Sequence, residues 1–312
     1  MAKNPSDHEE LQNGFRCKLN DAFITWIFKD RKLKIYFDFD ENNKNLYRKF
    51  LSIQFTHPYE DIGQIFHELV FIPTLFFFPD DISIIHGSAV QTDNDKAVLI
   101  GGTGGVGKTS LELSMIQKNN FKFLADDICI IDKNSNLWPN YAFPKIYRYN
   151  TQNKEEIEKK VLKNRGFLDR FQWNFFKLFP KKPIRRRINP KIFYDNKIGV
   201  KSKLSDYFIL FKGNFKEFSI RKISAEKAAY LNLEIVKVEY LMFLKHIYWH
   251  RINRSVLKDE LILEEETIFK KWLELQKKAL KKCNCNLVEI PLNYSIIDLE
   301  EKMLSILKIN NK

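Results

Sequence analysis

Five of the eleven glycines in this chain of 312 residues fall within seven consecutive positions. The stretch reads GGTGGVGKTS over residues 101–110 and fits the pattern G-x-x-x-x-G-K-[ST], with Gly102, Gly107, Lys108 and Thr109 at the fixed places. Glycine reaches positive φ without a steric penalty and lets a ligand approach the main chain closely. In this pattern backbone N–H groups surround phosphates, the lysine reaches the outer phosphates and the hydroxyl binds Mg²⁺. The residues therefore predict a phosphate-binding loop.

The expected nucleotide site extends beyond the fixed positions of the pattern. Backbone N–H groups of the loop should cradle the β-phosphate of ATP, and Lys108 should bridge its β- and γ-phosphates. The residues expected to contact ATP are Gly102, Thr103, Gly104, Gly105, Val106, Gly107, Lys108, Thr109 and Ser110.

Short elements on either side of the loop must position it. The run KAVLI (96–100) predicts a strand that enters the loop, and KTSLELSMIQK (108–118) predicts a helix of about 16 Å that leaves it. The run FKFLA (121–125) predicts a returning strand of nearly equal length. Asp126 and Asp127 then come back to the level of the loop, where Mg²⁺ and a reacting hydroxyl would need carboxylates. The alternative is that the two aspartates form a polar strand end or a helix cap, which would place two anions beside the bound phosphates without a cation.

A histidine is expected beside the same loop. The run SIIHGSAV (83–90), a polar turn and the run KAVLI predict a β-hairpin. Pairing Gln91 with Lys96 sets His86 opposite Gly101, where it could transfer a proton or contact a phosphate oxygen. A histidine on a strand is as often a satisfied core residue, so both interpretations stay open.

Composition restricts the class of protein. A hydrophobic content of 44% suffices for one large domain, or for a core domain with a smaller satellite. The apolar run FIPTLFFF (71–78) is too short to cross a bilayer. The start MAKNPSDHEE lacks the layout of a secretory signal and four cysteines are too few for a disulfide framework, so we expect a cytoplasmic protein. The CNC at 283–285 has no further ligands at a recognised spacing, and no metal site is predicted there.

Three regions are expected along the chain, with an α/β (α+β) fold. Residues 1–80 contain the runs AFITWIF, LKIYFDF and LSIQF, which predict strands. Residues 81–220 carry the loop in α/β alternation and form the expected ATP-binding core. Residues 221–312 have mainly helical periodicity, include a strand NLVEIPL, and end in a helix capped by Ser295 with Asp298. This last region is expected to pack on the core.

The formal net charge of +13 is compatible with nucleic acid, an anionic membrane face or an acidic partner. Most of this charge is spread along the chain, but KKPIRRR (181–187) forms a cluster. A solvated loop is one interpretation of the cluster. Because arginine forks suit carboxylates and phosphates, the other is a segment that closes over the nucleotide and contacts an acidic acceptor through Arg185, Arg186 and Arg187.

The runs IIHGSAV, GGTGGVGKT and FKFLADDICII resemble, in order and spacing, the kinase domain of HPr kinase/phosphorylase and its stand-alone relatives. That fold is shared with phosphoenolpyruvate carboxykinase. The resemblance covers residues 84–131, and residues 185–210 are similar to a segment of uncharacterised members of the group. It implies that Lys108 and Thr109 hold ATP phosphates and Mg²⁺, that the paired aspartates divide base and metal duties, and that His86 matches the family histidine.

The chain also departs from this family. Ser110 stands where the family has a glutamate, although Glu112 lies on the same predicted helix. The arginine-glycine motif and the loop tied to phosphorylase activity are not found, and residues 1–80 do not match the family's N-terminal domain. Lys145 and Arg148, in FPKIYRY, either replace the missing cation or are surface charges on a strand.

Together these features predict an HPr kinase-like enzyme that transfers a phosphoryl group from ATP to a hydroxyl. The acceptor would be a serine of a peptide or protein, or a small polar metabolite. Asp126 is expected to accept the hydroxyl proton, and Thr109 with Asp127 to hold Mg²⁺. No N-K-x-D motif follows the loop, which disfavours a G-protein. The alternative is a nucleotide-gated binding protein in which ATP orders the basic segment for nucleic acid or an acidic partner.

Overall fold

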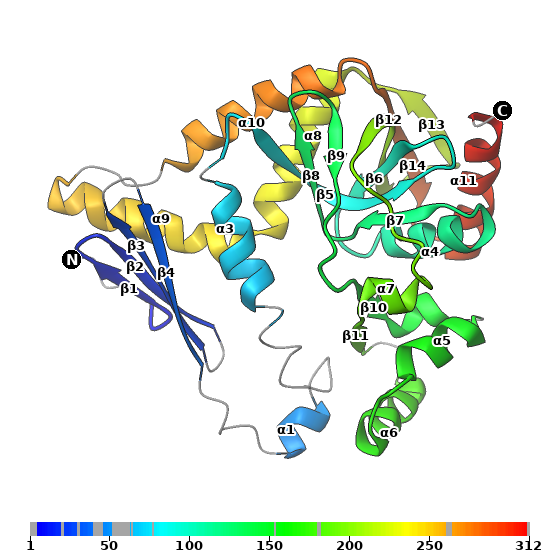
Figure 1. Cartoon of the computed structure of the whole chain (residues 1–312), viewed down its shortest axis with the longest axis horizontal. Coiled ribbons are helices and arrows are strands. Elements are labelled where there is room, and N and C mark those ends of the chain that lie inside the picture. Colours follow the sequence, from blue (N-terminus) through cyan, green and yellow to red (C-terminus); the bar gives the residue numbers. More distant parts are fainter. Residues whose placement is uncertain are drawn as a thin grey trace. The chain divides into compact units, whose positions relative to one another are not determined.

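The structure is a computed structural model. It describes residues 5–19, 22–29, 32–39, 46–51, 63, 65–76, 78–152, 154–179, 182–259 and 264–310. The chain divides into two compact units (Figure 1): unit 1 comprises Met1–Pro79 and Tyr240–Lys270, and unit 2 comprises Asp80–Glu239 and Lys271–Lys312. Among the described residues, no helix combines the length and the apolar character that a membrane span requires.

Unit 1 is built on an antiparallel sheet with the strand order β1-β2-β3-β4. Its strands are β1 (His8–Leu11), β2 (Gly14–Leu19), β3 (Ala22–Lys29) and β4 (Lys32–Phe39). Its helices are α1 (Leu46–Leu51), the π-helix η2 (His67–Phe71), α3 (Ile72–Leu75) and α9 (Leu241–Leu257). Helix α9 contacts β1 and β2, and the ring of Phe243 on α9 lies 5.7 Å from that of Trp26 on β3. One face of the sheet therefore forms the core of unit 1 with α9.

Unit 2 contains the largest sheet, with the order β13-β14-β12-β6-β5-β8-β9 and with β7 paired to β5. Because β12 also pairs with β9, five of these strands form a closed circuit. The strands are β5 (Ile82–Gln91), β6 (Lys96–Gly102), β7 (Lys122–Ala125), β8 (Ile128–Asp132), β9 (Asn136–Trp138), β12 (Ser202–Gly213), β13 (Ser219–Lys222) and β14 (Asn284–Pro291). A separate two-stranded sheet pairs β10 (Lys145–Tyr147) with β11 (Arg185–Arg187).

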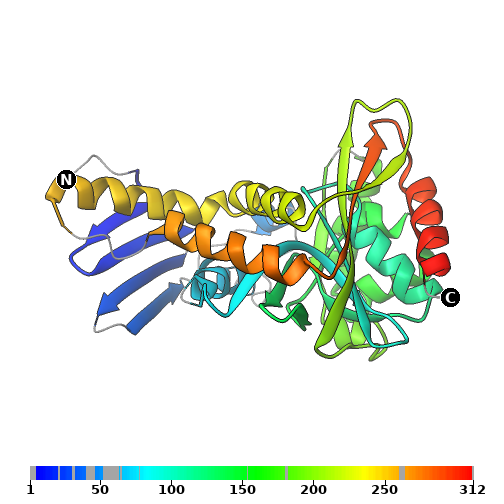
Figure 2. The same cartoon turned by 90° about the horizontal axis from the view of Figure 1, so that it is seen from above.

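Helices cover both faces of the large sheet (Figure 2). Helix α8 (Ala225–Glu239) and the later part of α10 (Glu265–Leu280) lie on one face, and α4 (Lys108–Lys118) with α11 (Ile296–Asn310) on the other. The remaining helices of unit 2 are η3 (Arg148–Thr151), α5 (Glu155–Leu162), α6 (Phe167–Phe175), η4 (Phe176–Leu178) and α7 (Pro190–Phe193). The result is a mixed α/β fold whose strand β6 leads directly into α4.

The hairpin and the returning strand expected from the sequence are confirmed. Strands β5 and β6 pair antiparallel, but Gly87 rather than His86 lies opposite Gly101. The one-residue shift arises because the turn is tighter than assumed: the N–H of Thr92 donates to the carbonyl of Lys96 at 2.8 Å, so Gln91 pairs with Ala97. The expected cap of α11 is also confirmed, since the Asp298 N–H donates to the Ser295 hydroxyl at 3.1 Å.

Several expected boundaries differ from the structure. The proposed strand LSIQF begins at Leu51, the last residue of α1, and its other residues lie outside the described part of the chain. The expected region 221–312 is divided, because Tyr240–Lys270 belongs to unit 1. The helical pattern breaks at Tyr240, whose φ and ψ are −107° and 22°. The predicted strand NLVEIPL is confirmed as part of β14, which pairs with β12 inside the large sheet of unit 2.

Candidate phosphate-transfer site

The glycine loop, residues 101–110, has a backbone that other residues would strain. Gly102 and Gly107 have φ angles of 133° and 105°, in the region that L-residues avoid. A Cβ atom on Gly102 would lie 2.5 Å from the carbonyl oxygen of Leu210, and one on Gly107 would lie 2.5 Å from Cδ1 of Ile296. The glycines therefore fix a tight turn between β6 and the first residue of α4, Lys108.

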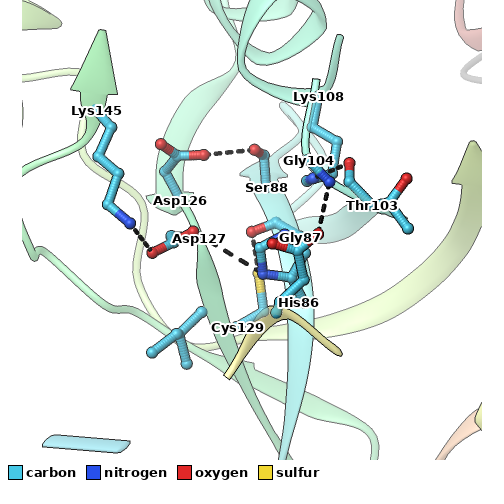
Figure 3. A network of polar contacts seen from close by, with 12 residues as sticks. His86, Gly87, Ser88, Thr103, Gly104, Lys108, Asp126, Asp127, Cys129 and Lys145 are labelled. Atoms are coloured by element: carbon cyan, nitrogen blue, oxygen red, sulfur yellow. Dashed lines mark hydrogen bonds and ion pairs between the residues drawn. The ribbon is translucent and has the colours of Figure 1, made fainter. Parts of the chain in front are cut away.

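The Lys108 side chain folds back over this turn (Figure 3). Its Nζ donates to the carbonyl oxygens of Gly102 and Thr103 at 2.9 and 2.8 Å. The side chain is buried, and burial lowers the pKa of Lys108, while the charges of Asp127 and Asp126 act in the opposite direction. The cation is thus held inside the loop, close to two carboxylates.

A carboxylate that the sequence analysis missed contacts the glycine loop. The backbone N–H of Gly104 donates to Oε1 of Glu239 at 2.7 Å. Glu239 is the last residue of α8 and lies 135 positions along the chain from Gly104, so no local spacing could have predicted the contact. Backbone N–H groups in glycine-rich turns attract anions, and here one of them binds a carboxylate.

Asp126 follows β7 and lies against the first turn of α4. Its Oδ1 accepts hydrogen bonds from the hydroxyls of Ser88 at 2.6 Å and Thr109 at 3.3 Å. Burial and then the charge of Asp127 raise the pKa of Asp126, partly offset by Ser88 and Lys108. The sequence had paired Thr109 with Asp127, but in the structure the Thr109 hydroxyl contacts Asp126.

Asp127 faces a different part of the site. Its φ of 73° is left-handed, which turns its side chain away from that of Asp126. Its Oδ2 accepts from Nζ of Lys145 at 2.8 Å, and its Oδ1 lies 3.9 Å from Nδ1 of His86. The adjacent carboxylates therefore have separate partners: Ser88 and Thr109 for Asp126, Lys145 and His86 for Asp127.

His86 lies between two carboxylates at the floor of the site. Its Nε2 is 3.9 Å from Oε2 of Glu239, the residue that also contacts Gly104. Burial, followed by the charge of Lys108, lowers the pKa of His86 to about 3. The imidazole is therefore neutral near pH 7 and can accept or donate a hydrogen bond without carrying a charge.

These groups open onto one cavity of about 250 Å³ in unit 2. Its lining residues are His86, Gly104, Gly105, Gly107, Lys108, Thr109, Asp126, Asp127, Lys145, Tyr147, Tyr149, Asn150, Arg185 and Glu239. A larger hollow of about 740 Å³ lies along α5 and α6 and contains no residue of the glycine loop. The smaller cavity is therefore the candidate site.

Some expected contact residues do not line this cavity. Those absent from its wall are Gly102, Thr103, Val106, Ser110, Arg148, Arg186 and Arg187. The Ser110 hydroxyl is buried and accepts from Nδ2 of Asn150 at 2.7 Å. Glu112 is also buried, where the Tyr194 hydroxyl donates to it and burial holds the pKa of its carboxyl well above the usual range. Glu112 therefore does not replace the family glutamate at the cavity.

The three arginines of the basic cluster form strand β11 (Arg185–Arg187), in which Arg186 and Arg187 are buried. Nε of Arg186 lies 2.6 Å from Oδ1 of Asp169, and its Nη2 donates to Gln172 at 2.6 Å. The guanidinium also lies over the ring of Trp173, 5.3 Å from its centroid. The expectation that Arg186 contacts an acceptor is wrong, because its charge is satisfied inside the protein. Only Arg185 of the three lines the cavity, where its Nη1 donates to the Tyr147 hydroxyl at 3.0 Å.

We predict that Arg186→Ala lowers the free energy of unfolding by up to about 3–5 kcal/mol, because it removes the fully buried partner of the Asp169 carboxylate and leaves only the 3.4 Å contact with Arg165. Urea denaturation measures the change. Arg185→Ala, one position earlier on the same strand, is the matched control and should change stability by less than about 1 kcal/mol. Equal effects of the two substitutions would contradict a buried ion pair specific to Arg186.

Comparison with known proteins finds a distant relationship. No family model matches the chain, and no curated protein matches it. Among solved structures, the chain is similar to the HPr(Ser) kinase/phosphatase from Coxiella burnetii, with 16% sequence identity and a TM-score of 0.25. The match covers 45% of this chain and 78% of the other. At this TM-score, the likeness amounts to a distant structural relationship and no more.

Proposed function

We propose that the chain is an ATP-dependent kinase that transfers the γ-phosphoryl group to a hydroxyl. The observation that supports this most strongly is the convergence of four groups on one cavity: the loop lysine Lys108, the helix hydroxyl Thr109, and the carboxylates Asp126 and Asp127. Phosphoryl transfer requires positioning, neutralisation of phosphate charge and a group that accepts the hydroxyl proton. The cavity contains a residue for each requirement.

In this proposal the glycine loop binds the phosphates of ATP. Backbone N–H groups of the loop donate to the β-phosphate, as the Gly104 N–H already does to a carboxylate. The Lys108 ammonium moves from the loop carbonyls to the bridge between the β- and γ-phosphates. Glu239 must leave the loop, because its negative charge would lie beside those of the phosphates.

Thr109 and Asp126 fit a magnesium site. They place a hydroxyl and a carboxylate oxygen 3.3 Å apart at the start of α4, and Mg²⁺ prefers such oxygen ligands together with water and phosphate. When bound, Mg²⁺ supplies neutralisation of the charge that develops on the phosphate oxygens. We therefore reverse the roles expected from the sequence and propose that Asp126 holds the metal with Thr109 while Asp127 is the base.

Asp127 accepts the proton of the acceptor hydroxyl as the new bond forms. The acceptor oxygen bonds to the γ-phosphorus, the bond to the β,γ-bridging oxygen breaks, and ADP leaves with that electron pair. Lys145 contacts Asp127 at 2.8 Å and is positioned to neutralise the γ-phosphoryl oxygens. Neutral His86 orients the Asp127 carboxylate. Arg185 and Tyr147 also line the cavity, where the Arg185 guanidinium donates to the Tyr147 hydroxyl, and they are the proposed contacts for the acceptor.

An acceptor assay distinguishes this proposal from a nucleotide-gated binding protein. The chain is incubated with Mg²⁺, a cell extract and ATP labelled in either the γ- or the α-phosphate. A kinase moves only the γ-label to an acceptor, whereas a binding protein moves neither and shows salt-sensitive binding to DNA. Burial of Arg186 and Arg187 already disfavours the alternative, because the segment that would bind nucleic acid does not expose them.

Replacing Glu239 should strengthen ATP binding. Glu239→Gln removes the negative charge that competes for the loop, and we expect the Kd of Mg·ATP to fall about 3- to 10-fold, the effect of a partly screened charge. Isothermal titration calorimetry measures the Kd. Glu234→Gln is the control, since Glu234 is on the same helix but pairs with Lys237. A weaker Kd in Glu239→Gln would mean that Glu239 assists nucleotide binding instead.

A further inference from the structure

Unit 1 contains a buried cluster of metal-binding side chains that is separate from the proposed kinase site. Strands β1 and β2 pair so that His8 lies directly opposite Cys17. Residues on one strand alternate between the two faces, so Glu10 shares the face of His8, while Glu9 between them is exposed. Helix α9 adds His246 and His250, which are one helical turn apart. All five side chains are buried.

Three of these residues converge on one point. His8, Cys17 and His246 each offer one ligand atom, and the three atoms lie within 4.8 Å of one another. The two Nδ1 atoms of His8 and His246 are 3.2 Å apart. Two nitrogen ligands at the usual zinc distance in a tetrahedral site are about 3.3 Å apart, and a nitrogen and a sulfur about 3.6 Å. The imidazoles already have nearly the required separation, and the thiol, within 4.8 Å of both nitrogens, needs a shift of about 1.2 Å at most.

Glu10 lies next to His8, one of the proposed ligands. Its Oε2 lies 3.5 Å from Nε2 of His8, and its Oε1 lies 2.7 Å from Nδ1 of His250. A carboxylate behind a metal-bound histidine fixes the ring and its tautomer. A proton on Nε2 of His8, facing Glu10, leaves the lone pair on Nδ1 directed toward His246.

We infer that His8, Cys17 and His246 form a binding site for Zn²⁺ in unit 1. Two imidazoles and one thiolate are ligands that favour zinc over Mg²⁺ or Ca²⁺. Binding releases the thiol proton of Cys17, and the fourth coordination position is left for water. Because the ligands come from β1, β2 and α9, the metal ties the helix to the sheet and its binding energy stabilises unit 1. A hydrogen bond between the two histidines, without metal, is the competing account.

Metal analysis of the full chain tests the site. The purified protein is stripped with a chelator, reloaded with Zn²⁺ and dialysed, and the bound metal is measured by plasma mass spectrometry. We expect one zinc per chain, and a higher Tm with zinc than without it. Titration with Co²⁺ should produce a thiolate-to-cobalt absorption band in the near ultraviolet. An absence of both stoichiometric zinc and this band would overturn the proposal.

Variants assign the ligands. Cys17→Ser should abolish the cobalt band and weaken zinc binding by at least about 100-fold, because loss of a ligand exceeds the 10- to 100-fold effect of an outer partner. Glu10→Gln should weaken binding within that smaller range. The triple variant Cys129→Ala/Cys283→Ser/Cys285→Ser, with all three changes in unit 2, leaves Cys17 as the one thiol of the chain. It should keep both the band and the zinc, which decides the question even where Cys17→Ser fails to fold. Loss of the band in that triple variant would overturn the assignment.

Discussion

Lys108→Ala should weaken Mg·ATP binding about 10- to 150-fold. A hydrogen bond to a charged group contributes about 1.5–3 kcal/mol, and that range corresponds to this change in Kd. The ammonium of Lys108 lies inside the glycine loop within 2.9 Å of two loop carbonyls. Lys145, another cation that lines the cavity, is already paired with Asp127. Isothermal titration calorimetry with a non-hydrolysable ATP analogue measures the loss without turnover.

Lys118→Ala is the matched control for this experiment. Lys118 occupies the other end of α4 and is exposed, so its removal changes the net charge equally without touching the loop. The Kd of Lys118→Ala for Mg·ATP should stay within about threefold of the Kd of the unmodified chain. Equal losses of Mg·ATP affinity in the two variants would mean that Lys108 acts only through long-range electrostatics. An unchanged Kd in Lys108→Ala would mean that the glycine loop does not bind the nucleotide through this lysine.

Asp127→Asn should lower the rate of phosphoryl transfer about 10²- to 10⁴-fold, the usual effect of removing a general base. An amide keeps the shape of the side chain and its place beside His86 and Lys145, but it cannot accept the hydroxyl proton. The Kd for Mg·ATP should therefore stay within about threefold. Single-turnover transfer of the γ-label, combined with calorimetry, separates the two quantities.

Asp126→Asn should give the complementary result. This substitution weakens the Mg²⁺ dependence of ATP binding, because Asp126 and Thr109 are the proposed protein ligands and lie 3.3 Å apart. If Asp126→Asn instead lost transfer with unchanged Mg·ATP binding, and Asp127→Asn lost the metal, the division of roles first expected from the sequence would hold.

Local spacing was sufficient to predict which residues come together at the glycine loop. Matching the length of helix α4 to that of the returning strand placed the two aspartates beside the loop, and the structure brings Asp126 within 3.3 Å of Thr109. The expected hairpin also exists, with a register that differs by one residue from the predicted one, so that Gly87 rather than His86 lies opposite Gly101. The error came from the turn, because the Thr92 to Lys96 hydrogen bond shifts the register and sequence alone did not determine it.

Contacts between distant parts of the chain could not be predicted in this way. Glu239 reaches Gly104 across 135 positions, and His246 reaches His8 across 238. Such contacts depend on how whole helices and strands pack against one another, and the periodicity of the sequence does not predict them. The prediction that Arg186 is exposed to an acceptor failed for a related reason. Its charge suggested exposure, but helix α6 brings Asp169 and Gln172 into contact with Arg186, which is buried.

A structure of the chain with Mg²⁺ and a non-hydrolysable ATP analogue would show where the phosphates and the metal bind. We expect the β-phosphate to accept hydrogen bonds from the N–H groups of the glycine loop, with Lys108 on the β- and γ-phosphates. We also expect the metal to lie between Thr109 and Asp126, and the Glu239 carboxylate to have left Gly104. An analogue bound elsewhere, with the 2.7 Å contact between Glu239 and Gly104 still in place, would contradict the account.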